Sequence, residues 1–472
     1  GATALKSLTF EEGTASSLQQ IGNYAFRYCY ELTEVNLPKS LTNLTARQVG
    51  STKYNRTAIG HYAFADCTKL STVNFEMGGD REMTFGIGVF NNCPELTTLN
   101  LPSRFVSYTN DLSGEEFGPL GERLTNKASG YTPNIFEGCT KLTAINVIMD
   151  DNGKPFLAEN ELTSHDGVAY VDEGKTLLRI PVGRVAAYEV PNTVERIDEF
   201  AAVNAEKLTA ITFEEGNDAL ELMIDQRAFE NCTSLTNVIL AKRVKVLAPR
   251  AFLNCTNLTS FELSANLSEF DATVFEGCTA LAAVNVATGS LKYSSKDGVL
   301  FNAINDVNTE VNTLYYYPAS KTDKVYSVPS TVKTIYSYAF SNNANLEEVI
   351  LPLGLQAIDS YAFYNATALK TVNIRKNVAT IGDYAFYNCT ALENLTFEEG
   401  GTSPLSIGDA NYINLSVFNS ETSSSNVKYG QTFYNCYMLT NVTLPERTKF
   451  IADYTFEKCL GLKTINIPNN VE

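Results

Sequence analysis

One 17-residue pattern recurs along the chain and constrains its fold more than any other feature. In the copy 381–397, apolar residues stand at position 0 and at positions 5, 11, 14 and 16, with a cysteine at position 8. Thirteen copies begin at Ile21, Ile59, Phe85, Tyr131, Ile197, Ile224, Leu247, Phe270, Ile335, Ile358, Ile381, Tyr429 (one residue short) and Ile451. Uninterrupted copies follow one another every 23 residues. A fixed period of this length is the signature of a solenoid.

The residues within one coil predict its two sides. Leu395 and Phe397 alternate with polar residues, as in a strand with one buried face, and proline often follows directly, as at Pro352. The first half of the coil predicts a tight helical or 3-10 turn that returns the chain. Because 23 residues cannot bury their apolar side alone, neighbouring coils must stack. We therefore expect a parallel β-sheet on the concave face and short helical or 3-10 turns on the convex face.

Length and insertions set the expected organisation. The 472 residues predict a single solenoid of about thirteen 23-residue coils over 1–472. Insertions of a β-hairpin type are expected at 148–196 and 287–334, because both contain Asp-Gly-Val, Tyr-Pro or Ile-Pro and Val-Pro in the same order. Asp-Gly between apolar residues is a turn signal. Long loops are expected at 38–58, 102–130 and 398–427, where long connections are often functional and sometimes disordered.

Composition narrows the function classes. The formal net charge is −17, from 53 acidic and 36 basic side chains, which argues against binding nucleic acid or an anionic membrane. No apolar run approaches the roughly 18 residues of a membrane-spanning helix. Gly1 is typical of a residue left by tag cleavage, so we expect any export signal or anchor to lie outside this sequence.

The ten cysteines all stand at position 8, at Cys29, Cys67, Cys93, Cys139, Cys232, Cys255, Cys278, Cys389, Cys436 and Cys459. Stacked equivalents could form disulfides, because their Cα atoms would lie at a bondable separation. The alternative is a column of free buried thiols, and it is favoured because Ala205 and Ala366 replace single cysteines without a paired loss. A metal site is not expected, since no Cys-x-x-Cys or histidine partner pattern occurs.

Catalysis is not expected either. The sequence has two histidines and lacks a nucleophile elbow, a P-loop, a dinucleotide-binding glycine pattern and a zinc signature. His165 and Asp166 form a possible catalytic pair, but Lys296 replaces the histidine in the second insertion, so a turn is the favoured interpretation. A separated carboxylate pair for glycoside hydrolysis stays open. We predict a protein that is not an enzyme and that uses no cofactor.

The repeated Ile-x-x-x-Ala-Phe-x-x-Cys-x-x-Leu-x-x-Val-x-Leu-Pro pattern resembles the BspA-type, or Treponema pallidum-type, leucine-rich repeat. The Asp-Gly-Val insertion is similar to one common in that family. The resemblance implies a right-handed leucine-rich-repeat solenoid on a secreted or surface-anchored protein, often from Bacteroidetes or other host-associated bacteria. It implies adhesion to host matrix proteins or other bacteria for some members.

Positions 13 and 15 alternate with the buried strand residues, so they are expected to face outward on the concave side. They give a candidate ligand-binding surface at Glu34, Asn36, Thr72, Asn74, Thr98, Asn100, Asn146, Asn285, Thr371, Asn373, Asn441, Thr443, Thr464 and Asn466. Rows of amides and hydroxyls offer hydrogen bonds at a low cost in side-chain entropy. The alternative is that these residues only keep an exposed sheet soluble.

The leading hypothesis is an extracellular or cell-surface adhesion protein that binds a host or microbial protein through its concave face and loops. Glycan binding for nutrient capture, or a structural stalk without a ligand, are the alternatives. Neither nucleic-acid binding nor membrane insertion is expected.

Overall fold

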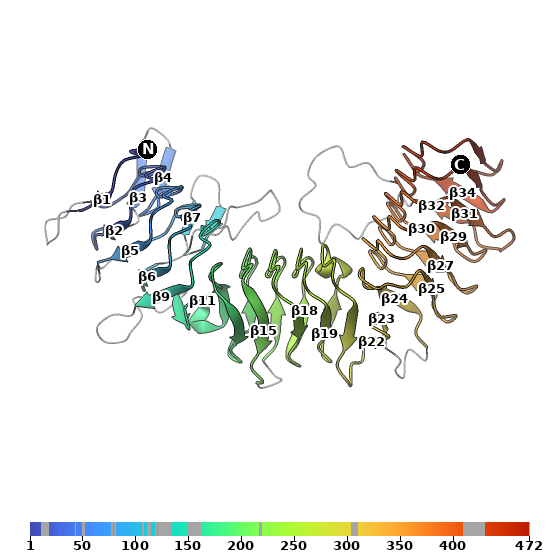
Figure 1. Cartoon of the computed structure of the whole chain (residues 1–472), viewed down its shortest axis with the longest axis horizontal. Helices are drawn as coiled ribbons and strands as arrows, with labels where there is room; N and C mark the ends of the chain where they lie inside the picture. Colours follow the sequence, from blue (N-terminus) through green and yellow to red (C-terminus); the bar gives the residue numbers. More distant parts are fainter. Residues whose placement is uncertain are drawn as a thin grey trace. The chain divides into compact units, whose positions relative to one another are not determined.

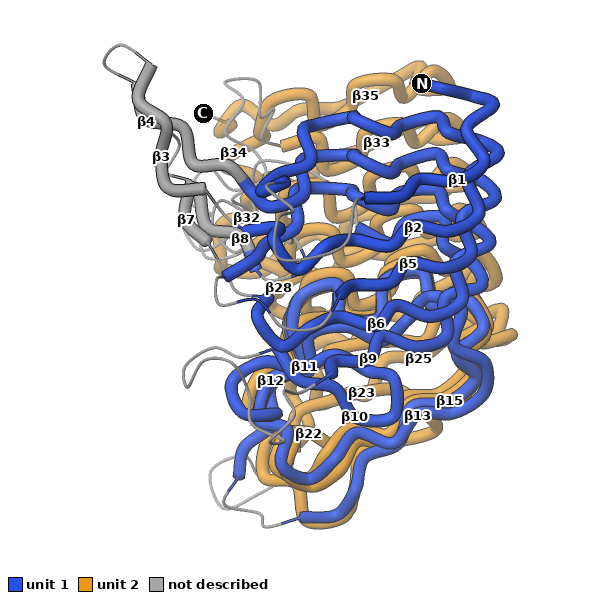
Figure 2. Tube along the Cα trace, turned by 90° about the vertical axis from the view of Figure 1, so that its left-hand side faces the viewer, with its two compact units in different colours: residues 1–233 blue, residues 234–472 orange. Residues whose placement is uncertain are grey.

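A computed structural model describes residues 1–10, 18–42, 44–49, 52–76, 79, 82–105, 108–110, 115–118, 120, 135–148, 162–216, 220–303, 310–408 and 430–471. The chain divides into two compact units, 1–233 and 234–472 (Figure 2). In each unit, short parallel strands repeat from coil to coil (Figure 1). The fold is therefore a parallel-strand solenoid, as the period predicts.

The N-terminal unit begins with a five-stranded parallel sheet whose strands lie one after another in Figure 2. Its order is β1 (Ser7–Leu8), β2 (Glu34–Leu37), β5 (Thr72–Phe75), β6 (Thr98–Pro102) and β9 (Ala144–Ile148). Two antiparallel pairs stand apart from it, β3 (Leu44–Val49) with β4 (Thr52–Arg56) and β7 (Tyr108–Asn110) with β8 (Glu115–Phe117). These two pairs fall within the expected loops 38–58 and 102–130.

A hairpin follows, and parallel pairing then resumes. The antiparallel strands are β10 (Thr163–His165), β11 (Val168–Val171) and β12 (Thr176–Arg179), with the 3-10 helix η2 (Asp172–Gly174) between the last two. The parallel pairs that follow are β12 with β14 (Arg196–Ile197), β14 with β16 (Leu222–Ile224), and β13 (Ala186–Val190) with β15 (Leu208–Phe213).

The C-terminal unit repeats this plan. Parallel strands β17 (Asn237–Ile239), β19 (Ser260–Leu263) and β21 (Ala283–Val286) pair in order, as do β18 (Val244–Leu247) and β20 (Glu269–Phe270), and η3 (Ala272–Phe275) follows. The second hairpin contains β22 (Tyr293–Lys296), β23 (Val299–Asn302) and β24 (Thr313–Tyr316).

Beyond that hairpin, the parallel strands belong to two sheets and one separate pair. One sheet comprises β25 (Val325–Ser327), β27 (Glu348–Ile350), β29 (Thr371–Ile374) and β31 (Asn394–Phe397). The other continues from β24 through β26 (Thr334–Ile335), β28 (Ala357–Ile358), β30 (Thr380–Ile381), β32 (Leu405–Ile407) and β34 (Thr448–Ile451). The pair is β33 (Asn441–Thr443) with β35 (Thr464–Asn466).

The return half of the coil differs from the expected helical turns. Position 0 belongs to a second row of short parallel strands, as when Ile335 pairs with Ile358. The residues after it form turns, and η2 and η3 are the 3-10 helices in the part of the chain that the structure describes. The reason is local, because positions 3 and 7 have left-handed backbones, as at Tyr361 (φ 61°) and Asn365 (φ 56°). A right-handed helix cannot pass through such residues.

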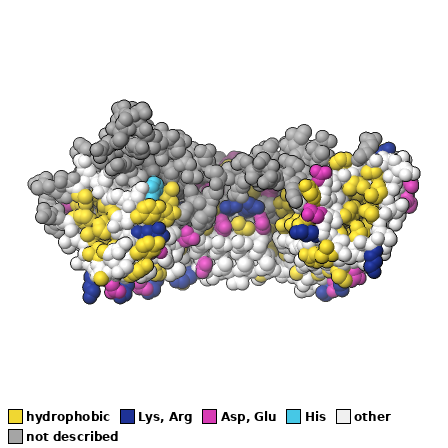
Figure 3. All heavy atoms as spheres, turned by 90° about the horizontal axis from the view of Figure 1, so that it is seen from above, with side chains coloured by type: hydrophobic (Ala, Val, Ile, Leu, Met, Phe, Trp, Pro, Cys, Tyr) yellow, Lys and Arg dark blue, Asp and Glu magenta, His cyan; other side chains and the backbone are white. Residues whose placement is uncertain are grey.

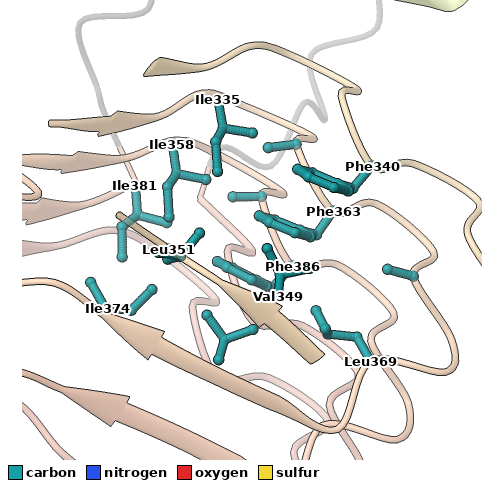
Figure 4. Close-up of a cluster of buried hydrophobic side chains, with 14 of the residues drawn as sticks. Ile335, Phe340, Val349, Leu351, Ile358, Phe363, Leu369, Ile374, Ile381 and Phe386 are labelled. Carbon is teal, nitrogen blue, oxygen red and sulfur yellow. The ribbon is translucent and has the colours of Figure 1, made fainter. Parts of the chain in front are cut away.

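The core consists of columns of equivalent side chains. Figure 4 shows the isoleucines of position 0 and the phenylalanines of position 5 stacked in successive coils. The rings of Phe340, Phe363 and Phe386 are nearly parallel, with centroids 4.8 Å apart at each step. All three rings are fully buried. Each coil thus covers the apolar side of its neighbour, as a repeat array requires.

The ten cysteines are free and buried, so the column of thiols is confirmed and the disulfide alternative is wrong. Thiols of this column hydrogen-bond to the coil before their own. The Sγ atom of Cys389 donates to the carbonyl oxygen of Phe363 at 3.2 Å, and Cys67 reaches Phe26 in the same way. Burial raises the pKa of Cys67 to about 12, which makes such thiols poor nucleophiles. Where Asn343 replaces cysteine, its amide donates to the carbonyl oxygen of Ala319 instead.

Within the described ranges, no helix is long and apolar enough to cross a membrane.

Candidate binding surface

The outward face of the first sheet carries the predicted polar row. Val35 and Leu37 of β2 are buried, whereas Glu34 and Asn36, which alternate with them, are exposed. The same alternation holds in β5 and, less fully exposed, in β6. Because the strands pair in register, Asn36 lies beside Asn74 and Asn100 lies beside Asn146. Side chains at equivalent positions therefore form rows across the sheet.

These amides hydrogen-bond to one another. Asn74 donates from Nδ2 to Oδ1 of Asn36 at 2.8 Å and to Oε1 of Glu34 at 3.1 Å. Asn146 donates to Asn100 at 2.9 Å. A primary amide has two N–H donors and two acceptor lone pairs. Asn74 uses both of its donors within the row, whereas Asn146 uses one of its two donors for Asn100. The row is held in one arrangement and still has hydrogen-bonding capacity for a ligand.

The candidate residues belong to separate sheets. Glu34, Asn36, Thr72, Asn74, Thr98, Asn100 and Asn146 share the first sheet, Asn285 lies on β21, Thr371 and Asn373 lie on β29, and Asn441, Thr443, Thr464 and Asn466 lie on β33 and β35. The separate sheets carry shorter ladders of their own. Thr396 donates to Asn373 at 3.1 Å, and Thr464 donates to Asn441.

We call the sheets that carry the candidate residues the long-strand sheets. The first hairpin follows β9, the last strand of one of these sheets, and the second hairpin follows β21, the last strand of another. The turn Asp166-Gly167 joins β10 to β11 with positive φ at both residues, the geometry of a type I′ turn. The carbonyl oxygen of Gly167 accepts from the N–H of Ile145 at 2.8 Å, and Ser164 Oγ accepts from Val147 at 2.7 Å. The hairpin therefore satisfies the edge of β9 that another strand would pair with.

The second hairpin repeats these contacts on β21. Gly298 and Ser295 accept from Val284 and Val286. A Cβ atom at Gly298 would lie 2.8 Å from Cβ of Ala283, and one at Gly167 would lie 2.9 Å from Cβ of Ala144. Sequence analysis missed this division of the surface, although alanine at position 13 before each Asp-Gly insertion was its signal.

The histidine and aspartate of the first insertion serve the turn. His165 is exposed and pairs with Val168 in the hairpin register. Asp166 accepts a hydrogen bond from Nη2 of Arg184, whose guanidinium lies 4.6 Å from the ring centroid of Tyr188. These contacts give Asp166 a structural role in the turn. No group of three His, Cys, Asp or Glu side chains that could hold a metal occurs among the described residues.

A second amide ladder runs along the turns, and sequence analysis did not predict it. The asparagines at position 7 have left-handed backbones, which asparagine tolerates better than most residues. Asn388 donates to Asn365 at 2.7 Å, and Asn435 donates to Asn388 at 2.6 Å. The Asn-Cys dipeptide in the repeat was the available signal. This ladder joins neighbouring coils, which accounts for the asparagine at position 7 without a ligand.

Aromatic side chains cover the same turns. Tyr338, Tyr361 and Tyr384 stack with centroids 4.7 and 4.8 Å apart. Their neighbours in the C-terminal unit include Tyr387 and Tyr434, which also stack at 4.8 Å. Hydrophobic side chains reach the surface in several places (Figure 3). Because the rings stack face to face, they present their edges to solvent, so the ladder stabilises the turns first.

Parts of each expected long loop lie outside the described residues. Of 102–130, the structure describes 102–105, 108–110, 115–118 and 120, and of 398–427 it describes 398–408. The loop 38–58 is described except for 43, 50 and 51, and the insertion 148–196 except for 149–161. The part of the second insertion that falls outside is 304–309.

Stacked coils of this period, with parallel strands and a leucine at position 11, define a leucine-rich-repeat protein. The model of the BspA type leucine rich repeat region matches residues 50–113, 184–297, 312–430 and 429–472. Because these ranges cover more than half of the chain, the protein belongs to the BspA-type leucine-rich repeat family.

Several solved structures are similar in fold. A leucine rich cell surface protein from Faecalibacterium prausnitzii A2-165 is 18 % identical over 98 % of this chain and 86 % of that one, with a TM-score of 0.45. A leucine-rich repeat protein from Eubacterium ventriosum ATCC 27560 is 22 % identical over 70 % and 80 %, with a TM-score of 0.47. The pneumococcal vaccine antigen PcpA is 18 % identical over 93 % and 69 %, with a TM-score of 0.40. No curated protein gives a significant match.

Proposed function

We propose that this protein is an extracellular or cell-surface adhesion protein that binds a host or microbial protein through the outward faces of its long-strand sheets. The observation that carries the proposal is the amide ladder of the first sheet. It presents Asn36, Asn74, Asn100 and Asn146 in register on a fully packed core. Repeat solenoids characteristically use such extended faces for binding, and the family membership supports the same class of function.

The chemistry of the face favours a polar ligand. Among its outward residues, Thr72, Thr98 and Asn100 are uncharged, and Glu34 shares its carboxylate with Asn74. Preformed amides and hydroxyls bind a ligand without paying much side-chain entropy. Peptide groups and sugar hydroxyls both satisfy such donors and acceptors, so a glycan is the second candidate. The loops within 38–58, 102–130 and 398–427 are proposed to contribute to the same binding.

The test uses one sample of the whole chain on two arrays, one of extracellular-matrix and bacterial surface proteins and one of glycans. Thr98→Arg places a long charged side chain on the first sheet, and Thr371→Arg is the matched change on β29. We expect a protein ligand whose affinity falls at least tenfold with one arginine and is unchanged with the other. Circular dichroism and thermal melting establish that both variants are folded.

Each outcome has a defined meaning. A glycan that responds to Thr98→Arg or Thr371→Arg supports the glycan alternative. Binding that neither substitution weakens would show that the sheet faces are not the site. Silence on both arrays would contradict adhesion and favour a stalk without a ligand.

A further inference from the structure

One part of the C-terminal unit departs from the polar character of the sheet faces. Val349 of β27 and Leu351, the residue after that strand, point into the buried cluster (Figure 4), so Ile350 between them points outward. Ile350 is 40 % exposed and lies beside Ser327 of β25 in the register. Val325 on β25 is 50 % exposed, and Leu353 just beyond β27 is 61 % exposed. Glu348 lies on the same face of β27 as Ile350. We call Val325, Glu348 and Ile350, together with Leu353 three residues further along the chain, the β25–β27 patch.

A carboxylate stands within this patch without a basic partner. Glu348 pairs with Val325 in the register and with Thr371 on the other side. Its neighbour Glu347 binds both nearby lysines, Lys324 at 3.1 Å and Lys370 at 2.7 Å. No basic side chain of the described residues forms an ion pair with Glu348. The two lysines are therefore already neutralised by a different carboxylate.

The N-terminal unit shows that the fold does not need these side chains. There β13 and β15 follow the first hairpin as β25 and β27 follow the second. Ala187 pairs with Ala210, and Glu189 pairs with Thr212. These positions correspond to Val325, Glu348, Ser327 and Ile350 in the second copy. The same backbone is thus built with alanine, alanine and threonine at the positions where the second copy carries valine, glutamate and isoleucine.

We infer that the β25–β27 patch is a docking surface for a protein segment that presents a lysine or arginine side chain among apolar side chains. The exposed valine, isoleucine and leucine supply contact area whose burial favours binding. Glu348 supplies the charge that selects a basic group, and a net charge of −17 attracts such a segment at long range. The inference deepens the proposed function, on which it rests, by naming one sheet and the chemistry of its partner.

The probe is a displayed library of random 12-residue peptides, selected on the whole chain and counter-selected on the double variant E348A/I350T. This variant installs the residues of the N-terminal unit, so it is expected to fold. We expect enriched peptides that share a lysine or arginine flanked by apolar residues. A synthetic copy of one such peptide should bind E348A/I350T at least tenfold more weakly than the unmodified chain.

A matched control removes the same chemistry elsewhere in the unit. Ile239 of β17 is exposed and pairs with Glu262 of β19, so E262A/I239T also deletes one outward carboxylate and one outward isoleucine. Peptide affinity should be unchanged in this control. Raising the salt concentration should weaken binding to the unmodified chain more than binding to E348Q, because screening acts on the ion pair with Glu348.

Three results would overturn the inference: no enrichment of basic–apolar peptides, equal binding to E348A/I350T, or loss of binding in E262A/I239T. These results are independent of the test of the proposed function. A matrix protein or glycan that binds the chain while no such peptide is enriched would leave the proposed function standing. Peptide binding at the patch without any ligand on the arrays would support this inference and count against those ligand classes.

Discussion

The stacked phenylalanines of position 5 should contribute much of the stability of the C-terminal unit, and Phe363→Ala tests this expectation. The Phe363 ring is 0 % exposed and stacks on Phe340 and Phe386, with both centroid distances at 4.8 Å. Truncating a buried phenylalanine costs about 3–5 kcal/mol. Each of the two ring pairs is worth about 0.5–1.5 kcal/mol beyond buried area, which places Phe363 high within that range. We therefore expect a loss near the upper end, about 4–5 kcal/mol.

Such a loss is a large share of the roughly 5–15 kcal/mol that stabilises a typical domain. Urea unfolding followed by circular dichroism measures it, with Phe363→Leu and Phe456→Ala as comparisons. Phe363→Leu keeps most of the buried apolar volume but removes both ring pairs, so it should cost less than Phe363→Ala. Phe456 is half-buried and stacks on one ring, Phe433, at 5.4 Å, so Phe456→Ala should cost about half as much as Phe363→Ala. A cost of Phe363→Ala below about 1 kcal/mol, or no larger than that of Phe456→Ala, would refute the stacked core.

Three further predictions concern the thiols, the hairpin turn and a buried carboxyl. Cys389→Ala should lower the free energy of unfolding by about 1 kcal/mol at neutral pH. Because burial raises the pKa of Cys389, the protonated thiol stabilises the fold fully only below its ordinary pKa. Urea unfolding should therefore show the cost of Cys389→Ala shrinking as pH rises above about 8.5. Gly167→Ala should destabilise the fold by about 1–2 kcal/mol because of its left-handed backbone, and by about 1–3 kcal/mol more because the new Cβ meets Ala144. Gly174→Ala, with open space around it, should show only the backbone cost in thermal melting. Equal costs for the two variants would contradict the packing of the turn. Burial raises the pKa of Asp359 from its ordinary value of about 4 to about 6, so stability falls as pH rises from about 4 to about 6. Asp359→Asn should therefore raise the free energy of unfolding at pH 7.5 and change it little near pH 3.5, and the reverse order would show that the carboxylate is stabilised.

The repeat could be predicted from the sequence because the same few side chains fill the interior of every coil. A leucine at position 11 and a phenylalanine at position 5 repeat only if each contacts its own equivalent, as Phe363 contacts Phe386. The free thiols followed from the same logic, since Ala366 replaces a single cysteine. The outward direction of Asn36 followed from alternation along β2.

Other features depended on backbone geometry that the apolar pattern does not reveal. The left-handed residues Tyr361 and Asn365 turn the return segment into a pair of corners instead of a helix. The division of the candidate surface into separate sheets depended on where the Asp166-Gly167 turn lies, which is fixed by the hydrogen bond from Ile145 to Gly167 and by the contact with Ala144. The patch at Glu348 became visible only when the registers of the two hairpin copies were compared.

A crystal structure of the whole chain, determined from crystals grown without reductant, tests the stacked-coil account most directly. We expect unbridged electron density at all ten cysteines, with the Sγ atom of Cys389 about 3.2 Å from the carbonyl oxygen of Phe363. Cysteines joined in disulfides between neighbouring coils, or thiols turned toward solvent, would contradict the stacked-coil account.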